Sequence, residues 1–161
     1  MRDTWHSSIK EIIMRAIDEA AAQGVSDVEA EHLLLAVAAD PDLPAARVLA
    51  GIGWDHTGIA GAFDTERAAS LAAAGVGPVD PKILRATRPP ARPGWGASAK
   101  AAIKNARIGP SKDRYRRTGS ADVDLVLAAI EAETGTVPRM LSYAGVDPAA
   151  LAARLHEGVP A

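Results

Sequence analysis

The amino-acid sequence predicts an all-α fold made of two pseudo-symmetric four-helix units, about eight helices in total. Two observations support this prediction. Apolar residues recur at helical rather than alternating spacing, and much of the first half of the chain is repeated in the second half. The 161 residues suffice for an independent core. Most apolar side chains are aliphatic and small, so we expect helices packed closely on helices.

The internal repeat holds at two nearly equal offsets. At an offset of 90 residues the matched residues are Trp5, Ser8, Lys10, Ile13 and Ala16 with Trp95, Ser98, Lys100, Ile103 and Ala106. At an offset of 92, the segment from His32 to Phe63 matches Asp124–Leu155 without a gap, with identities such as Arg47 and Arg139. We therefore divide the chain into a first repeat (residues 1–73), a Pro-rich linker (74–94) and a second, degenerate repeat (95–161). Together these form one compact domain.

The first two helices of each unit are predicted from apolar spacing and capping residues. In "SSIKEIIMRAIDEAAAQG" the Ile and Ala residues fall on one helical face. Ser7 or Ser8 is the expected N-cap, and Gly24 the expected end. "SDVE", Ser26 to Glu29, matches a capping box that opens the second helix.

The later helices are marked by the same residue types in both units. In the first unit we expect Asp42 and Pro44 to begin the third helix, Gly53 to end it and Asp55 to cap the fourth. Their counterparts in the second unit are Thr136, Pro138, Gly145 and Asp147, the last followed by Pro148.

The linker and the residues after it are rich in proline and in basic residues. Residues 74–94 hold five of the eleven prolines, which predicts an extended connection; alternatively, "KILR" packs into a groove between the two units. Residues 82–117 contain eleven Lys or Arg and one acid, although the whole chain carries a net charge of −2. Lys112, Arg114, Arg116 and Arg117 surround Tyr115 in a loop. This loop is either a solvated charged surface or a contact for phosphate.

Several functional classes are disfavoured by what the sequence lacks. Cysteine is absent, so we expect no disulfide framework and no thiolate zinc site. The sequence contains no Walker A motif, and its histidines are scattered. We therefore expect no enzymatic activity, no cofactor and no metal. No apolar run approaches the length of a transmembrane helix and the N-terminus lacks a signal-peptide pattern, so a cytoplasmic protein without membrane contact is expected.

The stretch "EAEHLLLAV", Glu29 to Val37, resembles a motif of the Clp N-terminal domain (the Clp R repeat). In that family the second helix opens with Gly-Thr-Glu-His-Ile/Leu-Leu-Leu-Gly-Leu, and the repeat begins with Phe-Thr-x-x-Ala. Trp5 and Trp95 stand where the phenylalanines would be. The resemblance covers nearly the whole chain, but in the second copy Val123 and Asp124 replace the Glu-His pair.

The resemblance implies a non-catalytic module that binds proteins or peptides. Known members stand at the front of Clp-type AAA+ unfoldases, where they bind adaptors and substrates, and some bind phosphorylated arginine. By position, Glu31 would contact the guanidinium, with His32 beside it as a further candidate binding residue, and Asp122 is the neighbouring substitute in the second copy. Related actinobacterial domains bind cyclic peptides near the aromatic residues that match Trp5 and Trp95. The implied partners are the Clp ATPase and protease system, its adaptors, and substrate proteins or peptides.

Each of these residues also has a plain structural interpretation. Glu31 in a first turn would stabilise the helix dipole, which is compatible with binding. His32 has no partner at metal-ligand spacing, so a packed or capping histidine is favoured over a zinc ligand. Trp5 and Trp95 would each hold the first helix of a unit against the core.

DNA binding is the alternative function. The basic segment 82–117 would neutralise phosphates in a small all-α protein. However, no helix-turn-helix is readable, and the basic residues lie mainly in a linker, one helix and a loop. This distribution argues against nucleic acid as the partner.

Overall fold

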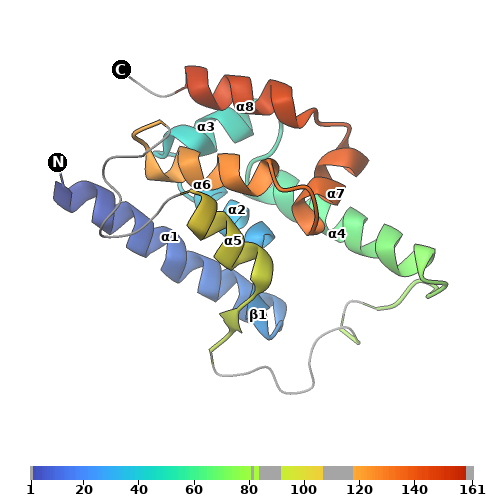
Figure 1. Cartoon of the computed structure of the whole chain (residues 1–161). Coiled ribbons are helices and arrows are strands. Elements are labelled where there is room, and N and C mark those ends of the chain that lie inside the picture. The colour runs from blue at the N-terminus through green and yellow to red at the C-terminus, as the bar shows by residue number, and fades with distance from the viewer. Residues whose placement is uncertain (1, 81, 84–91, 107–117, 159–161) are drawn as a thin grey trace.

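The computed structural model describes residues 2–80, 82–83, 92–106 and 118–158, with side chains from Ser8 onward. Within these residues the chain forms eight helices and one pair of two-residue strands, so the predicted all-α fold is confirmed (Figure 1). The helices of the first half are α1 (Arg2–Gln23), α2 (Ala30–Ala38), α3 (Pro44–Ala50) and α4 (His56–Ala73). Those of the second half are α5 (Ala97–Asn105), α6 (Ala121–Ile130), α7 (Thr136–Ala144) and α8 (Pro148–Glu157). The strands β1 (Asp27–Val28) and β2 (Gly94–Trp95) pair in parallel.

Helices α2 and α6 are central to the fold. Almost every residue of α2 and every residue of α6 is buried, because both helices are apolar on all sides except for a few polar positions in the first turn. They contact each other, and α1, α3, α5 and α7 pack against both of them. Helix α4 packs against α2, and α8 packs against α6 (Figure 1). The second helix of each half therefore has a similar set of neighbours.

The two halves share one core. Helix α4 of the first half packs against α7 of the second, and α3 packs against α8. The strand pair joins the segment before α2 to the segment before α5. The buried apolar residues of both halves belong to a single cluster. Burial of one shared cluster couples the stability of the two halves.

Several predicted helix ends are confirmed. Gly24, directly after α1, has φ +67°, and Gly145 ends α7 in the left-handed region, where glycine carries no Cβ penalty. Asp55 accepts a hydrogen bond of 2.8 Å from a first-turn N–H of α4. Asp147 accepts one of 3.1 Å at the start of α8, where Pro148 is the first helical residue.

Two predicted helix starts in the first half are wrong. Helix α1 begins at Arg2, so Ser7 and Ser8 lie inside it and do not cap it. The N-cap of α2 is Glu29 rather than Ser26. The difference has a tertiary cause, because Asp27–Val28 is held in an extended conformation by β2, which prevents an earlier helical turn.

The bounds of α3 also differ from the prediction. Its N-cap is Leu43, so Asp42 lies before the helix, although Pro44 is its first residue as expected. The helix ends at Ala50, and Gly53 lies in the following turn with φ +78°. In the second half Thr136 begins α7 as predicted.

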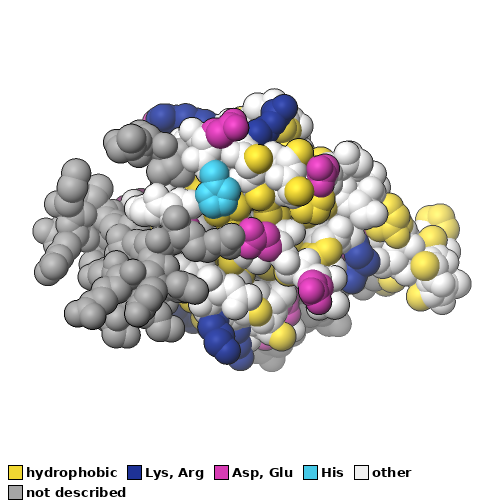
Figure 2. Space-filling model, turned by 45° about the horizontal axis from the view of Figure 1, so that its top comes forward, with side chains coloured by type: hydrophobic (Ala, Val, Ile, Leu, Met, Phe, Trp, Pro, Cys, Tyr) yellow, Lys and Arg dark blue, Asp and Glu magenta, His cyan; other side chains and the backbone are white. Residues whose placement is uncertain are grey.

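Helix α4 extends beyond the packed body, and hydrophobic side chains gather at its protruding end (Figures 1 and 2). Residues 74–80 follow it without helical structure, and Val76 is exposed there. The second half of the "KILR" segment (residues 84–85) and the linker from there to residue 91 lie outside the described residues. Among the helices of the described part of the chain, none combines the length and the apolar character needed to cross a bilayer.

Candidate functional site

The start of α2 is fixed by hydrogen bonds to α1 and α5. The Glu29 N–H donates to His32 Nδ1 at 2.9 Å, and His32 Nε2 lies 3.3 Å from Gln23 Oε1. The Glu29 carboxylate accepts from the Ser98 N–H at 3.0 Å and also from the Ser98 hydroxyl. In return, the Ala30 N–H donates to Ser98 Oγ at 2.8 Å. Each helix therefore caps the other across the two halves.

Glu31, the next acid along α2, is placed differently. Its side chain is 5% exposed, and its Oε2 atom has no hydrogen-bond partner among the described residues. The pKa of Glu31 is raised from 4.5 to about 7, chiefly by burial; a backbone hydrogen bond at Glu31 itself and the Arg139 guanidinium oppose this increase, whereas the Glu29 and Glu66 carboxylates add to it. Polar groups at this depth normally have a partner.

Glu31 lines a cavity of about 420 Å³ between α2, α4 and α7. The described lining includes four carboxylates, two guanidinium groups and three hydroxyl groups: Asp27, Glu29, Glu31, Glu66, Arg67, Arg139, Ser26, Ser70 and Thr136. The excess of acids makes the cavity negative overall. The cavity therefore favours a cationic group, while its two arginines leave room for an anionic group beside it.

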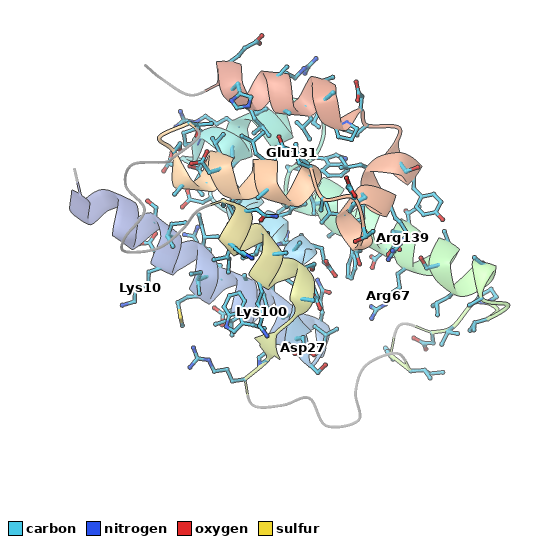
Figure 3. The ribbon with its side chains drawn as sticks, viewed as in Figure 1. Lys10, Asp27, Arg67, Lys100, Glu131 and Arg139 are labelled. Atoms are coloured by element: carbon cyan, nitrogen blue, oxygen red, sulfur yellow. The ribbon has the colours of Figure 1, made fainter. Side chains whose placement is uncertain are left out.

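An ion pair on the α4 and α7 side closes one wall of this cavity. Arg139 Nε donates to Glu66 Oε1 at 2.6 Å, and the Ser70 hydroxyl donates to the same atom at 2.6 Å. Glu66 is buried, whereas the side chain of Arg139 is 51% exposed. Figure 3 shows Arg67 and Arg139 on the neighbouring helices α4 and α7. The guanidinium of Arg139 is accessible even though it has a partner.

An aromatic wall completes the cavity. The Phe63 ring meets the His32 ring edge to face, with centroids 6.2 Å apart. The guanidinium carbon of Arg67 lies 5.7 Å from the Phe63 centroid, within the range of a cation–π contact. This wall holds Arg67 at the cavity edge.

His32 has the capping role that its sequence context favoured. Both ring nitrogens are occupied by α1 and by the start of α2, and burial lowers the pKa of the imidazole, so the ring is neutral near pH 7. Within the described part of the chain, no group of three His, Cys, Asp or Glu residues is arranged to hold a metal ion.

Asp122 lies apart from the Glu31 cavity, at the contact between α6 and α3. It is buried, accepts a hydrogen bond of 2.9 Å from the Ala45 N–H, and also accepts from the Ser120 hydroxyl. Its carboxylate therefore caps α3 from another helix. The structure does not bring Asp122 and Glu31 into one site.

The second half keeps a polar residue at the position of His32 but has no counterpart of the Glu31 carboxylate. Asp124 stands where His32 stands in the repeat, and it accepts hydrogen bonds from the Thr118 N–H and hydroxyl at 3.1 and 2.8 Å. Val123 stands where Glu31 stands and is fully buried. An apolar side chain there cannot pair with a cation, so the second half has no equivalent of the Glu31 carboxylate.

The remaining predicted residues are placed only in part. Trp95 is half-buried and packs against the core, which agrees with its structural interpretation. Trp5 lies in α1, but its side chain is outside the described residues. The basic loop residues Lys112, Arg114, Arg116 and Arg117 also lie outside them, so their role stays a prediction.

The cavity residues that the sequence did not single out include the ion pair and the second arginine: Glu66, Arg139 and Arg67. Arg139 carried a signal, because it matches Arg47 in the repeat. In the structure Arg47 lies on the surface near Pro41, whereas Arg139 faces the cavity. Glu66 and Arg67 follow the last matched residue of the first repeat, so no pattern marked them.

A scan against protein-family models finds no match to this chain, and no curated protein matches its sequence. The resemblance to the Clp N-terminal domain therefore stays a prediction.

Proposed function

We propose that this chain is a non-catalytic, peptide-binding module of the Clp N-terminal type, in which the Glu31 cavity binds an arginine side chain of a partner protein. One observation carries this proposal. Glu31 Oε2 is buried at the cavity without a hydrogen-bond partner among the described residues, whereas the Glu29 and Glu66 carboxylates have partners.

The unpartnered Oε2 atom of Glu31 is energetically unfavourable. Burying a carboxylate oxygen without a hydrogen-bond donor is costly, and the same burial raises the pKa of Glu31. A guanidinium entering the cavity would supply two parallel N–H donors and a positive charge. Its arrival would lower the pKa of Glu31, so ionisation of Glu31 and binding of the cation favour each other.

The charges around Glu31 support phosphoarginine as a preferred form of this ligand. That side chain combines a guanidinium with a negative phosphoryl group. Arg67, Arg139 and the Thr136 hydroxyl line the same cavity as Glu31 and provide donors for the phosphoryl oxygens. A cavity with two guanidinium groups and a carboxylate oxygen that lacks a partner among the described residues suits both parts of the ligand.

Such a module would select marked or unfolded proteins for a Clp-type protease. It would compete for these proteins, or for adaptors and cyclic peptide ligands, with the N-terminal domain of a Clp ATPase. We propose that it acts in the cytoplasm. The absence of a Walker A motif from the sequence means that ATP-driven unfolding would come from the partner.

The decisive experiment compares binding of one labelled peptide in three forms, with arginine, phosphoarginine or citrulline at its centre. Binding to the whole chain is measured by fluorescence anisotropy. We expect phosphoarginine to bind most tightly and citrulline least. Glu31→Gln should weaken the arginine and phosphoarginine peptides about tenfold to a hundredfold, the range for a lost charged hydrogen bond.

Glu157→Gln is the matched control, because this exposed glutamate at the end of α8 lies away from the cavity. It should bind all three peptides like the wild type. Equal affinity of wild type and Glu31→Gln for the arginine and phosphoarginine peptides would refute the assignment of the cavity. Equal affinity for the arginine and citrulline peptides would do the same.

A further inference from the structure

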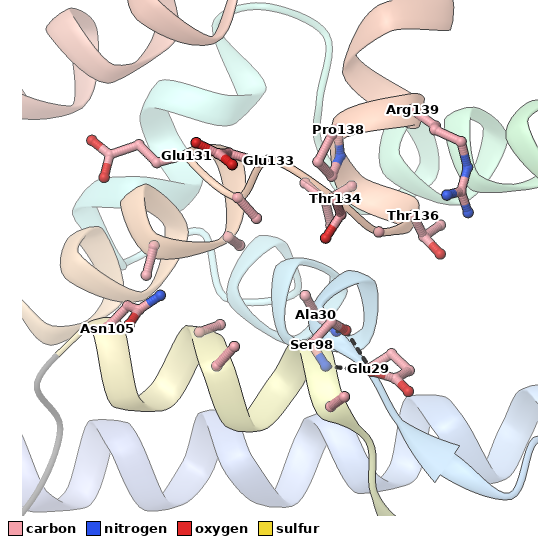
Figure 4. A pocket seen from close by; sticks show the side chains of 18 residues that line it. Glu29, Ala30, Ser98, Asn105, Glu131, Glu133, Thr134, Thr136, Pro138 and Arg139 are labelled. Carbon is pink, nitrogen blue, oxygen red and sulfur yellow. Dashed lines mark hydrogen bonds between the residues drawn. The ribbon is translucent and has the colours of Figure 1, made fainter.

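A second, larger depression lies beside the Glu31 cavity. It is a groove of about 710 Å³ bounded by α5 on one side and by the end of α6, residues 131–135 and the start of α7 on the other (Figure 4). The apolar part of its lining consists mainly of seven alanines: Ala30, Ala97, Ala101, Ala102, Ala128, Ala129 and Ala132. Because these side chains are short, the groove leaves space for larger apolar side chains from a partner.

The rim of this alanine-lined groove is polar and mainly acidic. Three of the four charged residues that line it are glutamates, Glu29, Glu131 and Glu133, and the fourth is Arg139. Glu131 and Glu133 lie at one end, with Asn105 on the facing helix (Figure 4). That end is also the C-terminus of α6, where the helix dipole places partial negative charge. Both contributions favour a cationic group at the α6 end.

The groove adjoins the Glu31 cavity. Glu29, Thr136 and Arg139 line both depressions, so the two lie on either side of these residues. A chain with one side chain in the Glu31 cavity would therefore pass over Thr136 into the groove. In Figure 4 Thr136 and Arg139 lie at the end opposite Glu131 and Glu133.

From this adjacency and the charge distribution we propose that the groove binds an extended polypeptide segment of an unfolded partner protein. The segment carries apolar side chains over the alanines and a lysine or arginine near Glu131 and Glu133. This inference rests on the proposed function, because it takes the arginine in the Glu31 cavity as the anchor of the same segment. The module would then select basic, apolar, extended sequences rather than an isolated arginine.

The test uses two labelled peptides and two variants that leave Glu31 intact. The short peptide has one arginine between glycines and serines. The long peptide adds leucines and valines followed by a lysine. Ala101→Trp fills the groove from an exposed position of α5, and Glu133→Lys reverses a charge at its end. Ala153→Trp, at an exposed position of α8 away from the groove, is the control.

We expect wild type to bind the long peptide at least tenfold more tightly than the short one. Ala101→Trp should remove this difference without weakening the short peptide, and Ala153→Trp should change neither. Glu133→Lys should weaken only the long peptide, and more strongly at low salt. Glu31→Gln should weaken both.

Two results would overturn the groove assignment and leave the proposed function standing. One is equal binding of both peptides to wild type. The other is an unchanged preference for the long peptide in Ala101→Trp. Failure of both peptides to bind at millimolar concentration would overturn both proposals. Concentration-dependent self-association that Ala101→Trp abolishes would assign the groove to a second copy of this chain and refute the peptide occupant.

Discussion

The buried carboxylate of Glu31 should make the stability of the fold depend on pH in a predictable direction. The pKa of this group is 4.5 in the unfolded chain and about 7 in the folded one. Below pH 4.5 both states are protonated and Glu31 has no effect. Between the two values the unfolded chain releases its proton while the folded one retains it, so stability falls as pH rises. Above pH 7 the loss is complete and amounts to about 3 kcal/mol.

Glu31→Gln removes this dependence, because an amide of similar shape does not ionise. The assay is urea unfolding of wild type and variant at pH 5 and pH 8, followed by far-ultraviolet circular dichroism. We expect similar midpoints at pH 5 and a higher midpoint for the variant at pH 8. The difference in unfolding free energy at pH 8 should approach the 3 kcal/mol derived above. Parallel stability curves for the two proteins would show that Glu31 is solvated or already paired, and would refute the argument for an unsatisfied carboxylate.

Further predictions concern three contacts that hold the halves together and one glycine inside α4. Gly96→Ala should destabilise the fold by about 2 to 3 kcal/mol, because the added Cβ would lie 1.9 Å from a carboxylate oxygen at the start of α2. Gly61→Ala, in open space on α4, should instead stabilise the fold by about 0.5 to 1 kcal/mol. Thermal unfolding of these two glycine-to-alanine variants beside wild type tests both signs. Asp122→Ala should cost about 1 to 2 kcal/mol through loss of the cap on α3, measured by urea unfolding, with partial recovery in Asp122→Asn. Arg139→Ala should cost about 1 to 2 kcal/mol by leaving the buried Glu66 carboxylate without its main partner, and adding Glu66→Gln should recover part of that loss in a double-mutant cycle.

The affinity for a cation should also depend on pH. Only ionised Glu31 pairs with a guanidinium, so the arginine peptide should bind about tenfold more tightly at pH 8 than at pH 6. Anisotropy titrations at both pH values measure this ratio. Glu31→Gln should lose the dependence, and an identical ratio in that variant would assign it to another group.

The all-α class and the order of helices could be predicted because their signals are local or repeated. Apolar spacing marked the helices, and glycine or aspartate marked several of their ends, such as Gly145 and Asp147. The error at Ser26 has a different origin. A capping-box pattern was present, but pairing with β2, almost seventy residues away, kept Asp27–Val28 extended. Tertiary contacts of this range leave no local pattern.

Of the residues that line the candidate site, the sequence singled out only Glu31 and its neighbour His32 as candidate binding residues. Glu31 was found through a family motif, whereas Glu66 and Arg67 come from the part of α4 beyond the repeat. Their presence beside Glu31 depends on the packing of α4 against α2 and α7, which no spacing along the chain indicates. Asp122 shows the converse. Its sequence position suggested a second binding carboxylate, but its oxygens are used to cap α3 and to bind Ser120.

The two halves differ at the position where the repeat would otherwise place a second acid, and this difference supports a binding role for Glu31. At the equivalent position Val123 packs in the core and needs no partner. The fold therefore accommodates an apolar residue there, and Glu31 is not required by the architecture. The buried Glu31 carboxylate also lowers the stability of the fold. This loss is a sizeable part of the roughly 5 to 15 kcal/mol by which native domains are stable. The capping residues on either side, Glu29 and His32, already satisfy the start of α2. A carboxylate that is costly, structurally replaceable and open to a cavity with two arginines is best explained by a ligand that pairs with it.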